Sequence, residues 1–572
     1  MQNESSGPQI IRFGAFELDV RGGELRKQGI KIKLQEQPLR MLEMLLAHPA
    51  ELVTREELRS RLWPSDTLVD FDHGLNKAIN KLREALGDSA EAPRFIETVP
   101  KRGYRFLQPM ANAAPEASIA VLPFLNLTND PENEVFADGI CEEIMFSLAQ
   151  IRDLRVTART SSFSFKGKFV DLRTVGQQLN VRTLLEGSVR RFGDRLRVTA
   201  QLVDVADGYH LWSGQYDRQL KDLFAIQEEI AQSIAQNLEV TLEAESQPVV
   251  RGGTENVEAF KEFVRGRGFF FQRGQRLLAS LECFKRAVTL DPKYALAWSG
   301  LADACNMIGL YGLASPEICV PQAKEAAQRA IELDPLLAEA HNSLAASHLF
   351  HDWDHSRSER EFLRSLELKP NNALARAWYG YLYLHWAMGR FEEGAEQVEE
   401  AVRIDPLSAY ARGMLAFAYL PIDGDRCLEA VQDTFRIDPD SFLGRWAQMG
   451  ALNLLGRYEE CAKVGESTLR MSGRAAWIIG ALARTYARLG RQADAEALYM
   501  ELRWRAKREY VAPAVLGWAA WAVGEHDEAI RLEEEAHAIG DPSLIAAKYW
   551  PDFADLHEDP RFQEILRARG WT

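Results

Sequence analysis

Amide and cationic side chains recur at helical spacing within residues 71–88. They form two adjacent stripes, Asn76, Asn80 and Arg83 in one and Lys77 and Lys81 in the other. Side chains three and four residues apart share a helical face. Amides both donate and accept hydrogen bonds, whereas Lys and Arg donate and carry positive charge. This combination suits a surface that presents acceptor groups together with negative charge.

The same stretch carries an aliphatic stripe, made of Leu75, Ile79, Leu82 and Leu86. Its steps of four, three and four residues are the period of an amphipathic helix. Because the aliphatic stripe needs a core to face, we expect the amides and cations to point outward.

The residues around this helix predict a small α+β domain at residues 10–107. Alternating apolar and polar residues predict strands, and Thr54 with Glu57 forms a capping box that opens a helix. The expected elements, in order, are a strand at 13–20, a hairpin at 23–34 turned at Gly29, helices at 37–49 and 55–62, the polar helix, and two short strands at 95–106.

Two strings in this domain carry a family resemblance: GLNKAINKLREALGD at residues 74–88 and PRFIETVPKRGYRF at residues 93–106. They resemble the winged helix-turn-helix DNA-binding domain of OmpR/PhoB-type regulators, in the branch of CadC-, ToxR- and HilA-like activators. The resemblance implies that the polar helix enters the major groove of promoter DNA, where base edges present donors and acceptors. The hairpin that follows is then the wing, which reaches an adjacent minor groove or its phosphates.

The resemblance also implies which side chains touch DNA. Base contacts are implied for Asn76, Lys77, Lys81 and Thr98, and phosphate contacts for Trp63, Asn80, Arg83, Lys101 and Arg102, with Tyr104 completing the set. The loop at residues 64–71 is implied to contact RNA polymerase, and Gly103 is expected to permit the tight turn of the wing. A merely solvated helix face is the alternative; the wing and the strand order favour DNA.

The middle of the chain predicts an α/β domain at residues 118–245, after a linker at residues 108–117. Strands are expected at 117–124, 154–159, 181–205 (two, turned at Gly193) and 209–218, and helices at 135–151, 171–180 and 223–240. The strings AVLPF, FADGI, ARTSSFSFKGK, LEGSVRR and LWSGQYDR make this region similar to TolB N-terminal/FlgO-like domains.

No catalytic constellation is found in the middle region, and no cofactor is predicted. Glu142 and Glu143 are adjacent, so on a helix they diverge by about 100° and cannot face each other. His210 has no nucleophile motif beside it, and no phosphate-binding loop occurs. We expect a sensor or a spacer rather than an enzyme.

Residues 255–572 predict an all-α repeat. Its two marks are prolines in LDP, LKP or IDP, at Pro292, Pro335, Pro370, Pro406 and Pro439, and glycines at Gly389, Gly456, Gly490 and Gly524. The period near 34 residues resembles the tetratricopeptide repeat. Each helix pair needs neighbours to bury its apolar face, so stacking predicts a superhelix with a groove. We expect the groove to hold a peptide or protein partner; a homodimer and an inert spacer are the alternatives.

Charge and composition limit where a polyanion could bind. The 572-residue chain has a net charge of -15, but residues 1–110 carry 17 Lys and Arg against 16 Asp and Glu. The six cysteines lack metal-ligand spacing and predict buried thiols in a reducing compartment. The N-terminus has no signal-peptide pattern, and the longest uncharged run, 510–524, is too short to cross a bilayer. We expect a cytoplasmic protein without membrane contact.

The leading hypothesis is therefore a sequence-specific DNA-binding transcriptional regulator whose repeats and middle region receive signals through protein contacts. Only about a dozen residues precede the winged helix, so control by a phosphorylated receiver domain is not expected in spite of the family's association with phosphorelay. The alternative is a repeat scaffold whose winged helix binds protein rather than DNA. An enzyme such as a cyclase is disfavoured, because no nucleotide loop or metal-binding carboxylate pair is visible.

Overall fold

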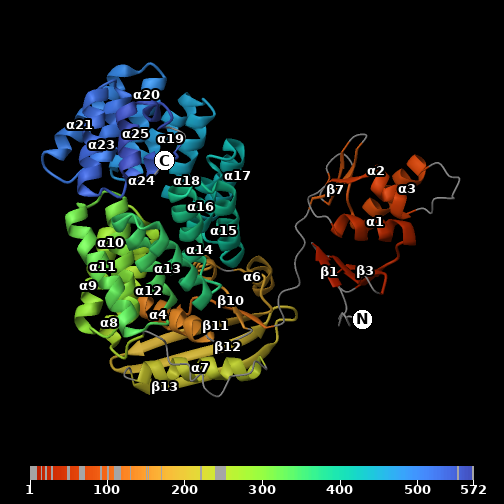
Figure 1. Ribbon diagram of the computed structural model, residues 1–572. Helices are drawn as coiled ribbons and strands as arrows, with labels where there is room; N and C mark the ends of the chain where they lie inside the picture. Colours follow the sequence, from red (N-terminus) through yellow and green to blue (C-terminus); the bar gives the residue numbers. More distant parts are fainter. Residues whose placement is uncertain are drawn as a thin grey trace. The chain divides into compact units, whose positions relative to one another are not determined.

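The computed structural model describes most of the chain (Figure 1). The described residues are 10–13, 16–19, 22–27, 30–47, 52–62, 71–89, 93, 95–99, 102–107, 117–128, 130–149, 151, 154–168, 170–219, 222–238, 253–550 and 553–569. Contacts divide the chain into two compact units, residues 1–118 with 172–182, and residues 119–171 with 183–572.

The first unit begins with a four-stranded antiparallel sheet in the order β1-β2-β3-β4. Its strands are β1 (Ile10–Phe13), β2 (Phe16–Asp19), β3 (Glu24–Lys27) and β4 (Ile30–Ile32). Phe16, Leu18 and Leu25 bury their side chains in the domain core, as the alternation of apolar and polar residues predicted. The hairpin prediction around Gly29 is confirmed by the pairing of β3 with β4.

Three helices and a second sheet complete the winged-helix domain. These elements are α1 (Glu36–Ala47), β5 (Leu52–Thr54), α2 (Arg55–Leu62), α3 (Phe71–Leu86), β6 (Ile96–Val99) and β7 (Gly103–Phe106). The three strands pair antiparallel in the order β5-β7-β6. The sequence did not predict β5, because three residues are too few to show a period; pairing with the distant β7 makes it a strand.

The predicted capping box is confirmed at the start of α2. The Glu57 backbone N–H donates to Thr54 Oγ1 at 3.2 Å, and the Thr54 backbone N–H donates to Glu57 Oε2 at 2.8 Å. Two backbone donors that a helix start leaves without partners are thereby satisfied. The reciprocal pair fixes where β5 ends and α2 begins.

The middle region forms a mixed sheet in the order β10-β8-β11-β12-β13, with β9 paired to β11. Its elements are β8 (Ser118–Val121), β9 (Leu125–Asn126), α4 (Pro131–Leu148), β10 (Arg155–Val156), α5 (Arg159–Phe163), α6 (Leu172–Leu179), β11 (Thr183–Phe192), β12 (Arg195–Asp204), β13 (His210–Gln219) and α7 (Leu223–Asn237). β8 runs parallel to β11, whereas β11, β12 and β13 are antiparallel. Helix α5 was not predicted, because its five residues carry no apolar period.

The rest of the second unit is helical (Figure 1). The helices are α8 (Val257–Gln272), α9 (Arg276–Leu290), α10 (Ala295–Leu310), α11 (Pro316–Leu333), α12 (Ala338–Ser347), η2 (His348–Asp352), α13 (His355–Leu368), α14 (Ala373–Trp378), η3 (Tyr379–Ala387), α15 (Phe391–Ile404), α16 (Ala409–Tyr419), α17 (Gly424–Ile437), α18 (Phe442–Leu454), α19 (Tyr458–Met471), α20 (Ala476–Arg488), α21 (Gln492–Ala506), α22 (Pro513–Ala522), α23 (His526–Ile539), α24 (Leu544–Ala547), η5 (Leu556–Glu558) and α25 (Pro560–Ala568).

Consecutive helices pack in pairs, α8 on α9, α10 on α11, and so on to α22 on α23. The predicted glycine marks lie between the helices of a pair: Gly456 and Gly490 have φ of 71° and 72°. Only glycine adopts this left-handed conformation without strain, so these residues end one helix and let the chain reverse. The repeat architecture predicted from the period is confirmed.

Residues 119–171 of the middle region, and those from 183 on, form one unit with the repeats. Helix α4 lies against α8 so closely that a Cβ on Gly139 would be 2.6 Å from the Phe260 ring. Helix α5 docks on the loop between α15 and α16, where the buried Asp405 carboxylate accepts the Ser161 backbone N–H at 3.1 Å and the Thr160 and Ser161 hydroxyls. The Leu407 backbone N–H in turn donates to Ser161 Oγ at 2.8 Å.

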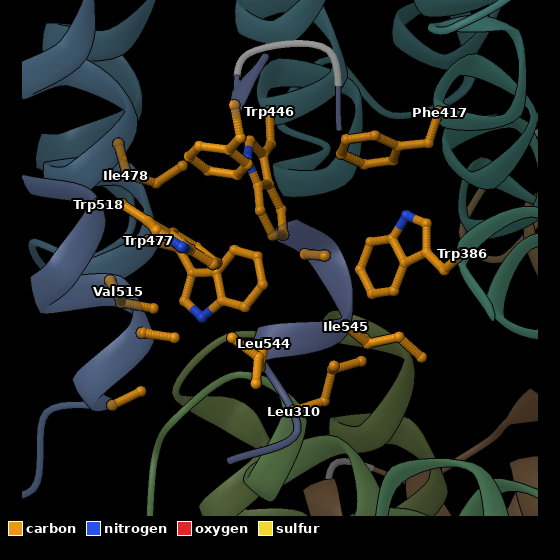
Figure 2. Packing of buried hydrophobic residues seen from close by; sticks show 14 of the residues in the cluster. Leu310, Trp386, Phe417, Trp446, Trp477, Ile478, Val515, Trp518, Leu544 and Ile545 are labelled. Carbon is orange, nitrogen blue, oxygen red and sulfur yellow. The ribbon is translucent and has the colours of Figure 1, made fainter. Parts of the chain in front are cut away.

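Aromatic side chains from the first helices of successive pairs line the interior of the repeat array. Figure 2 shows Trp386 of η3, Phe417 of α16, Trp446 of α18, Trp477 of α20 and Trp518 of α22 gathered there. They form a continuous buried layer, in which Trp446 and Trp477 meet at 4.8 Å between ring centroids.

A segment after α23, described at residues 541–550 and 553–556, fills the space over this layer. Leu544 and Ile545 of α24 point into the same cluster (Figure 2). Trp550 stacks on Trp446, with ring centroids 5.6 Å apart, and Phe553 lies 4.8 Å from Trp518. The structure therefore differs from the expected open groove along this face, because Leu544, Ile545, Trp550 and Phe553 of the same chain occupy it.

Two further predictions concern cysteines and membranes. All six cysteines are buried free thiols, as predicted. Among the residues that the structure describes, none of the helices combines the length and the apolar character that crossing a membrane requires.

Candidate nucleic-acid interface

Helix α3 is anchored by its aliphatic stripe. Leu75, Ile79, Leu82 and Leu86 are each at most 2% exposed and belong to the core of the winged-helix domain. Burying four such side chains stabilises the docked helix by about 1.5–3 kcal/mol for each one. The opposite face of α3 cannot turn inward without exposing this stripe.

Three of the predicted contact residues lie on the outward face of α3. Asn76, Lys77 and Asn80 are exposed. Lys81 is only partly exposed, and its Nζ donates to Gln35 Oε1, 2.8 Å away, just before α1. The predicted stripe of amides and ammonium groups is therefore present, with Lys81 tied to a neighbouring residue.

Arg83 departs from the predicted outward stripe. Its side chain is 6% exposed, and Nη2 donates to Ile96 O at 2.8 Å and to Thr98 Oγ1 at 2.9 Å. The helix there turns toward the wing, so the guanidinium satisfies acceptors in β6 instead of facing solvent. Arg83 consequently positions the wing against α3, with Thr98 itself exposed beside it.

Asn76 is held by a cluster that the sequence did not reveal. Asn76 Oδ1 accepts hydrogen bonds from Tyr104 Oη at 3.1 Å and from Arg55 Nη2 at 3.2 Å. Tyr104 is buried in β7, and Arg55 opens α2, so three elements meet at one amide oxygen. The capping box at Thr54 marked the helix start but gave no signal that Arg55 would reach α3.

The wing is the β6–β7 hairpin. The Arg102 backbone N–H donates to Val99 O at 3.0 Å, and the exposed Arg102 side chain stands at its turn. Gly103 has a reason other than the predicted tight turn: a Cβ there would be 2.1 Å from Val53 O in β5. The glycine lets β5 and β7 approach closely.

Residues within the two sequence motifs at 74–88 and 93–106 also join α3 to the wing. Gly87 ends α3 with φ of 66°, and the Asp88 carboxylate accepts the backbone N–H groups of Phe95 and Ile96 at 3.2 and 2.9 Å. The helix end and the first wing strand are therefore held at one carboxylate. Trp63, Lys101 and residues 64–70 of the expected polymerase-contacting loop lie outside the described residues.

The described residues hold no group of three or more His, Cys, Asp or Glu side chains that could bind a metal ion. The geometry is that of a helix and a hairpin presenting amides, a hydroxyl and cations on adjoining surfaces. Such groups can bond base edges and phosphate oxygens.

Comparisons with known families match two separate parts of the chain. The family described as "Transcriptional regulatory protein, C terminal" matches residues 29–106, and the family described as "Tetratricopeptide repeat" matches residues 375–406. The TolB-like identity of the middle region stays a prediction.

Curated relatives cover longer stretches. A Rhizobium meliloti protein provisionally named adenylate cyclase 3 is 39% identical over 244 residues, which are 42% of this chain and 41% of that protein. Transcriptional regulator HilA of Salmonella typhimurium is 24% identical over 418 residues, 70% of this chain and 71% of HilA. The chain thus spans less than half the length of the Rhizobium protein.

A solved structure also matches, the DNA-binding domain of Klebsiella pneumoniae RstA in complex with the RstA box. It is 28% identical, with a TM-score of 0.16, and the match covers 17% of this chain and 97% of that domain. Residues 29–106 of this chain thus form a winged-helix domain of the OmpR/PhoB type found in transcriptional regulatory proteins, and a tetratricopeptide repeat follows at residues 375–406.

Proposed function

We propose that this protein is a sequence-specific DNA-binding transcriptional regulator. Helix α3 enters the major groove, and the β6–β7 wing lies on the adjoining backbone. One observation carries the proposal: Asn76, Lys77 and Asn80 are exposed on a helix whose opposite side is sealed into the core. HilA, which is named a transcriptional regulator, supports the same reading.

The two hydrogen bonds that Asn76 Oδ1 accepts within the protein indicate which kind of base edge the Asn76 side chain reads. Its Oδ1 already accepts from Tyr104 and Arg55, so both lone pairs of this oxygen are engaged. The Nδ2 group is left to donate, which suits guanine O6, purine N7 or thymine O4 in the major groove. The bidentate contact to adenine that the residue type suggests would require Asn76 to break its hydrogen bonds with Tyr104 and Arg55.

The remaining partners follow from the domain order. The loop at residues 64–71 contacts RNA polymerase, the repeats and middle region receive signals through protein contacts, and the chain acts in the cytoplasm, as a monomer or a homodimer. Protein partners of the repeats then use surfaces other than the aromatic interior, which residues 541–550 and 553–556 fill. The competing proposal is a scaffold whose winged helix binds protein.

A second function is favoured by the name of the Rhizobium relative alone. The full chain incubated with ATP and Mg²⁺ should form no cyclic AMP if the protein is a regulator without enzymatic activity. Formation of cyclic AMP above a heat-denatured control would make the cyclase the better proposal.

The test of DNA binding is a double variant on the outward face of α3. Chromatin immunoprecipitation with sequencing would first define the operator. Lys77→Ala with Asn80→Ala should weaken operator binding, measured by fluorescence anisotropy, by about tenfold to hundredfold. The variant removes one expected base contact, worth about 1–3 kcal/mol, together with the phosphate contact expected of Asn80. Both residues are exposed, so the fold should be unchanged in circular dichroism.

A matched control removes the same charge elsewhere in the domain. Lys31→Ala deletes an exposed cation of β4 whose Nζ pairs with Glu24 at 2.5 Å. Its operator affinity should stay within about twofold of the parent, because surface ion pairs contribute little. Equal losses in both variants would show a general charge effect, and no loss in the double variant would refute the proposed interface.

A further inference from the structure

A cavity of about 350 Å³ lies where the middle region meets the repeats. We call it the junction cavity. Its walls come from α4, α5, α8, α10, α12, α14 and α16, so residues far apart in the sequence share one space. Small-molecule sites in proteins measure roughly 300–1,000 Å³, and the junction cavity therefore fits a ligand at the small end of that range.

Aromatic rings form one wall of the junction cavity. Phe263, Phe270 and Phe271 of α8 line it together with Tyr410 of α16. The Phe271 and Tyr410 rings are perpendicular, with centroids 6.3 Å apart. Arg267 lies over the Phe263 and Phe271 rings, and Arg273 lies over the Phe270 and Tyr410 rings. The ring atoms that line the cavity beside these cations offer apolar contact to the hydrocarbon part of a ligand.

Several charges in the cavity are already matched by the protein. Arg159 forms an ion pair with Glu142, and Lys369 Nζ lies 2.9 Å from Glu339 Oε1. The Asp405 carboxylate is satisfied by its donors in α5. The charges of these groups need no ligand to balance them, although Glu142 is paired with Arg159 through Oε1 only.

One cation and one anion remain without a close partner of opposite charge. Arg267 lies no nearer than 4.0 Å to the Glu142 carboxylate, and Asp303 accepts one hydrogen bond, from Ser343 Oγ at 2.7 Å. Both side chains line the junction cavity. Burial raises the pKa of Asp303 to about 7, and the Ser343 hydrogen bond and the Arg273 and Arg267 charges oppose this rise only in part.

Two acceptors beside them are also unsatisfied. Within the described residues, neither Asn342 Oδ1 nor Glu142 Oε2 has a hydrogen-bond donor, although Asn342 is 2% exposed and Glu142 is 9% exposed. Buried polar atoms are nearly always hydrogen-bonded. These two oxygens, with Asp303, call for a ligand group that carries several N–H donors.

We propose that the junction cavity binds a small zwitterion, an α-amino acid with an apolar side chain. The ligand carboxylate pairs with Arg267, its ammonium group donates to Asp303 and the neighbouring acceptors, and its side chain lies against the rings of α8. Because the ligand touches both the middle region and the repeats, its binding stabilises their junction. The site is independent of any contact that α3 makes with DNA.

The test compares three probes of similar size on the full chain by isothermal titration calorimetry. L-phenylalanine carries both charges, 2-phenylethylamine only the cation and 3-phenylpropionate only the anion. L-phenylalanine should bind at least about tenfold more tightly than either analogue, since a lost charge contact of about 1.4 kcal/mol is a factor of ten. This comparison needs no variant, so it does not depend on a substitution being tolerated.

Charge-removing variants then assign the two ends of the ligand. Asp303→Asn should abolish the higher affinity of L-phenylalanine relative to 3-phenylpropionate, which lacks the ammonium group. Arg267→Gln should abolish its higher affinity relative to 2-phenylethylamine, which lacks the carboxylate. Arg265→Gln is the matched control on α8, because Arg265 pairs with Glu262 at 3.1 Å and does not line the cavity. It should leave all three affinities unchanged.

Three outcomes would overturn the proposal. The first is absence of binding by L-phenylalanine, L-leucine and L-tryptophan at millimolar concentration, which would leave the cavity a hydrated junction. The second is equal affinity for the zwitterion and its singly charged analogues. The third is binding that neither Asp303→Asn nor Arg267→Gln changes, which would place the ligand elsewhere.

Discussion

At the scale of single residues, neighbours in space decide the role of a side chain. Arg83 and Asn80 have the same helical spacing from the aliphatic stripe, yet Asn80 is exposed and Arg83 is buried against β6. The long guanidinium can reach Ile96 O, whereas the short amide cannot. Asn76 is exposed but has its oxygen committed to Tyr104 and Arg55.

Buried Glu143 gives a prediction about pH. Burial raises the pKa of its carboxyl from 4.5 to about 8, Glu142 adds repulsion, and Arg267 partly opposes both. Between these pH values the unfolded chain releases the proton and the folded chain keeps it, so stability falls as pH rises. Glu143→Gln removes this loss and should raise the free energy of unfolding at neutral pH by on the order of 3 kcal/mol.

Denaturant unfolding followed from pH 5 to 8 measures this effect. The parent should lose stability with rising pH more steeply than the variant. Glu229→Gln serves as control, because Glu229 is exposed on α7. Parallel pH profiles for the parent and Glu143→Gln would show that Glu143 does not hold its proton in the folded state.

At the scale of elements, short segments acquire their structure from what they pair with. β5 becomes a strand through β7, and α5 is held by Asp405 from the repeats. Neither segment is long enough to be stable alone, because a helix needs roughly 12–15 residues to form in water. Their conformations therefore depend on contacts made elsewhere in the chain.

Loss of the Asp405 carboxylate should release α5 from the repeats. Asp405→Ala leaves the Ser161 backbone N–H and two hydroxyls without their acceptor, which should cost about 3 kcal/mol. Hydrogen exchange at residues 159–163 should accelerate accordingly. The matched control is Asp438→Ala, the same position of the next repeat, where the side chain is exposed.

Exchange at residues 159–163 should be unchanged in Asp438→Ala. If Asp405→Ala and Asp438→Ala behave alike, the carboxylate has only the local turn-forming role that the repeat motif gives it. The docking of α5 would then rest on other contacts.

At the scale of the whole molecule, the repeat array is stabilised by its own C-terminal segment. Trp550 contacts Trp446, Phe417 and Trp386, which belong to three different helices. One side chain thereby links repeats that are distant in sequence. The interior is a hydrophobic core rather than an open groove along this face.

Replacement of Trp550 by alanine should lower the stability of the second unit as a whole. Trp550→Ala should lower its free energy of unfolding by about 2–4 kcal/mol, because the aromatic layer loses its covering ring. Trp504→Ala is the control, since Trp504 is 56% exposed on α21. Chemical denaturation followed by far-ultraviolet circular dichroism distinguishes the two.

A small and equal effect of both substitutions would mean that residues 541–550 and 553–556 cover the layer without stabilising it. The segment would then be free to give way to a partner. A large effect of Trp550→Ala alone agrees with a permanent part of the core.

Local periodicity accounts for what the sequence alone determined. The stripe at Leu75, Ile79, Leu82 and Leu86, the capping box at Thr54 and the glycine marks of the repeats each lie within a few turns of chain. Helix and turn geometry act over that range, so these helices and the repeats could be predicted. The winged-helix arrangement was implied by the family resemblance of residues 74–88 and 93–106.

Only the tertiary structure decided which groups meet across long separations. Four pairings join segments that no sequence period relates: Arg83 with Ile96, Asp405 with Ser161, Arg267 with Asp303 around one cavity, and Trp550 with Trp446. Their pairing follows from how packed elements bring buried polar and aromatic groups together. That outcome depends on the whole fold and is absent from any short stretch of sequence.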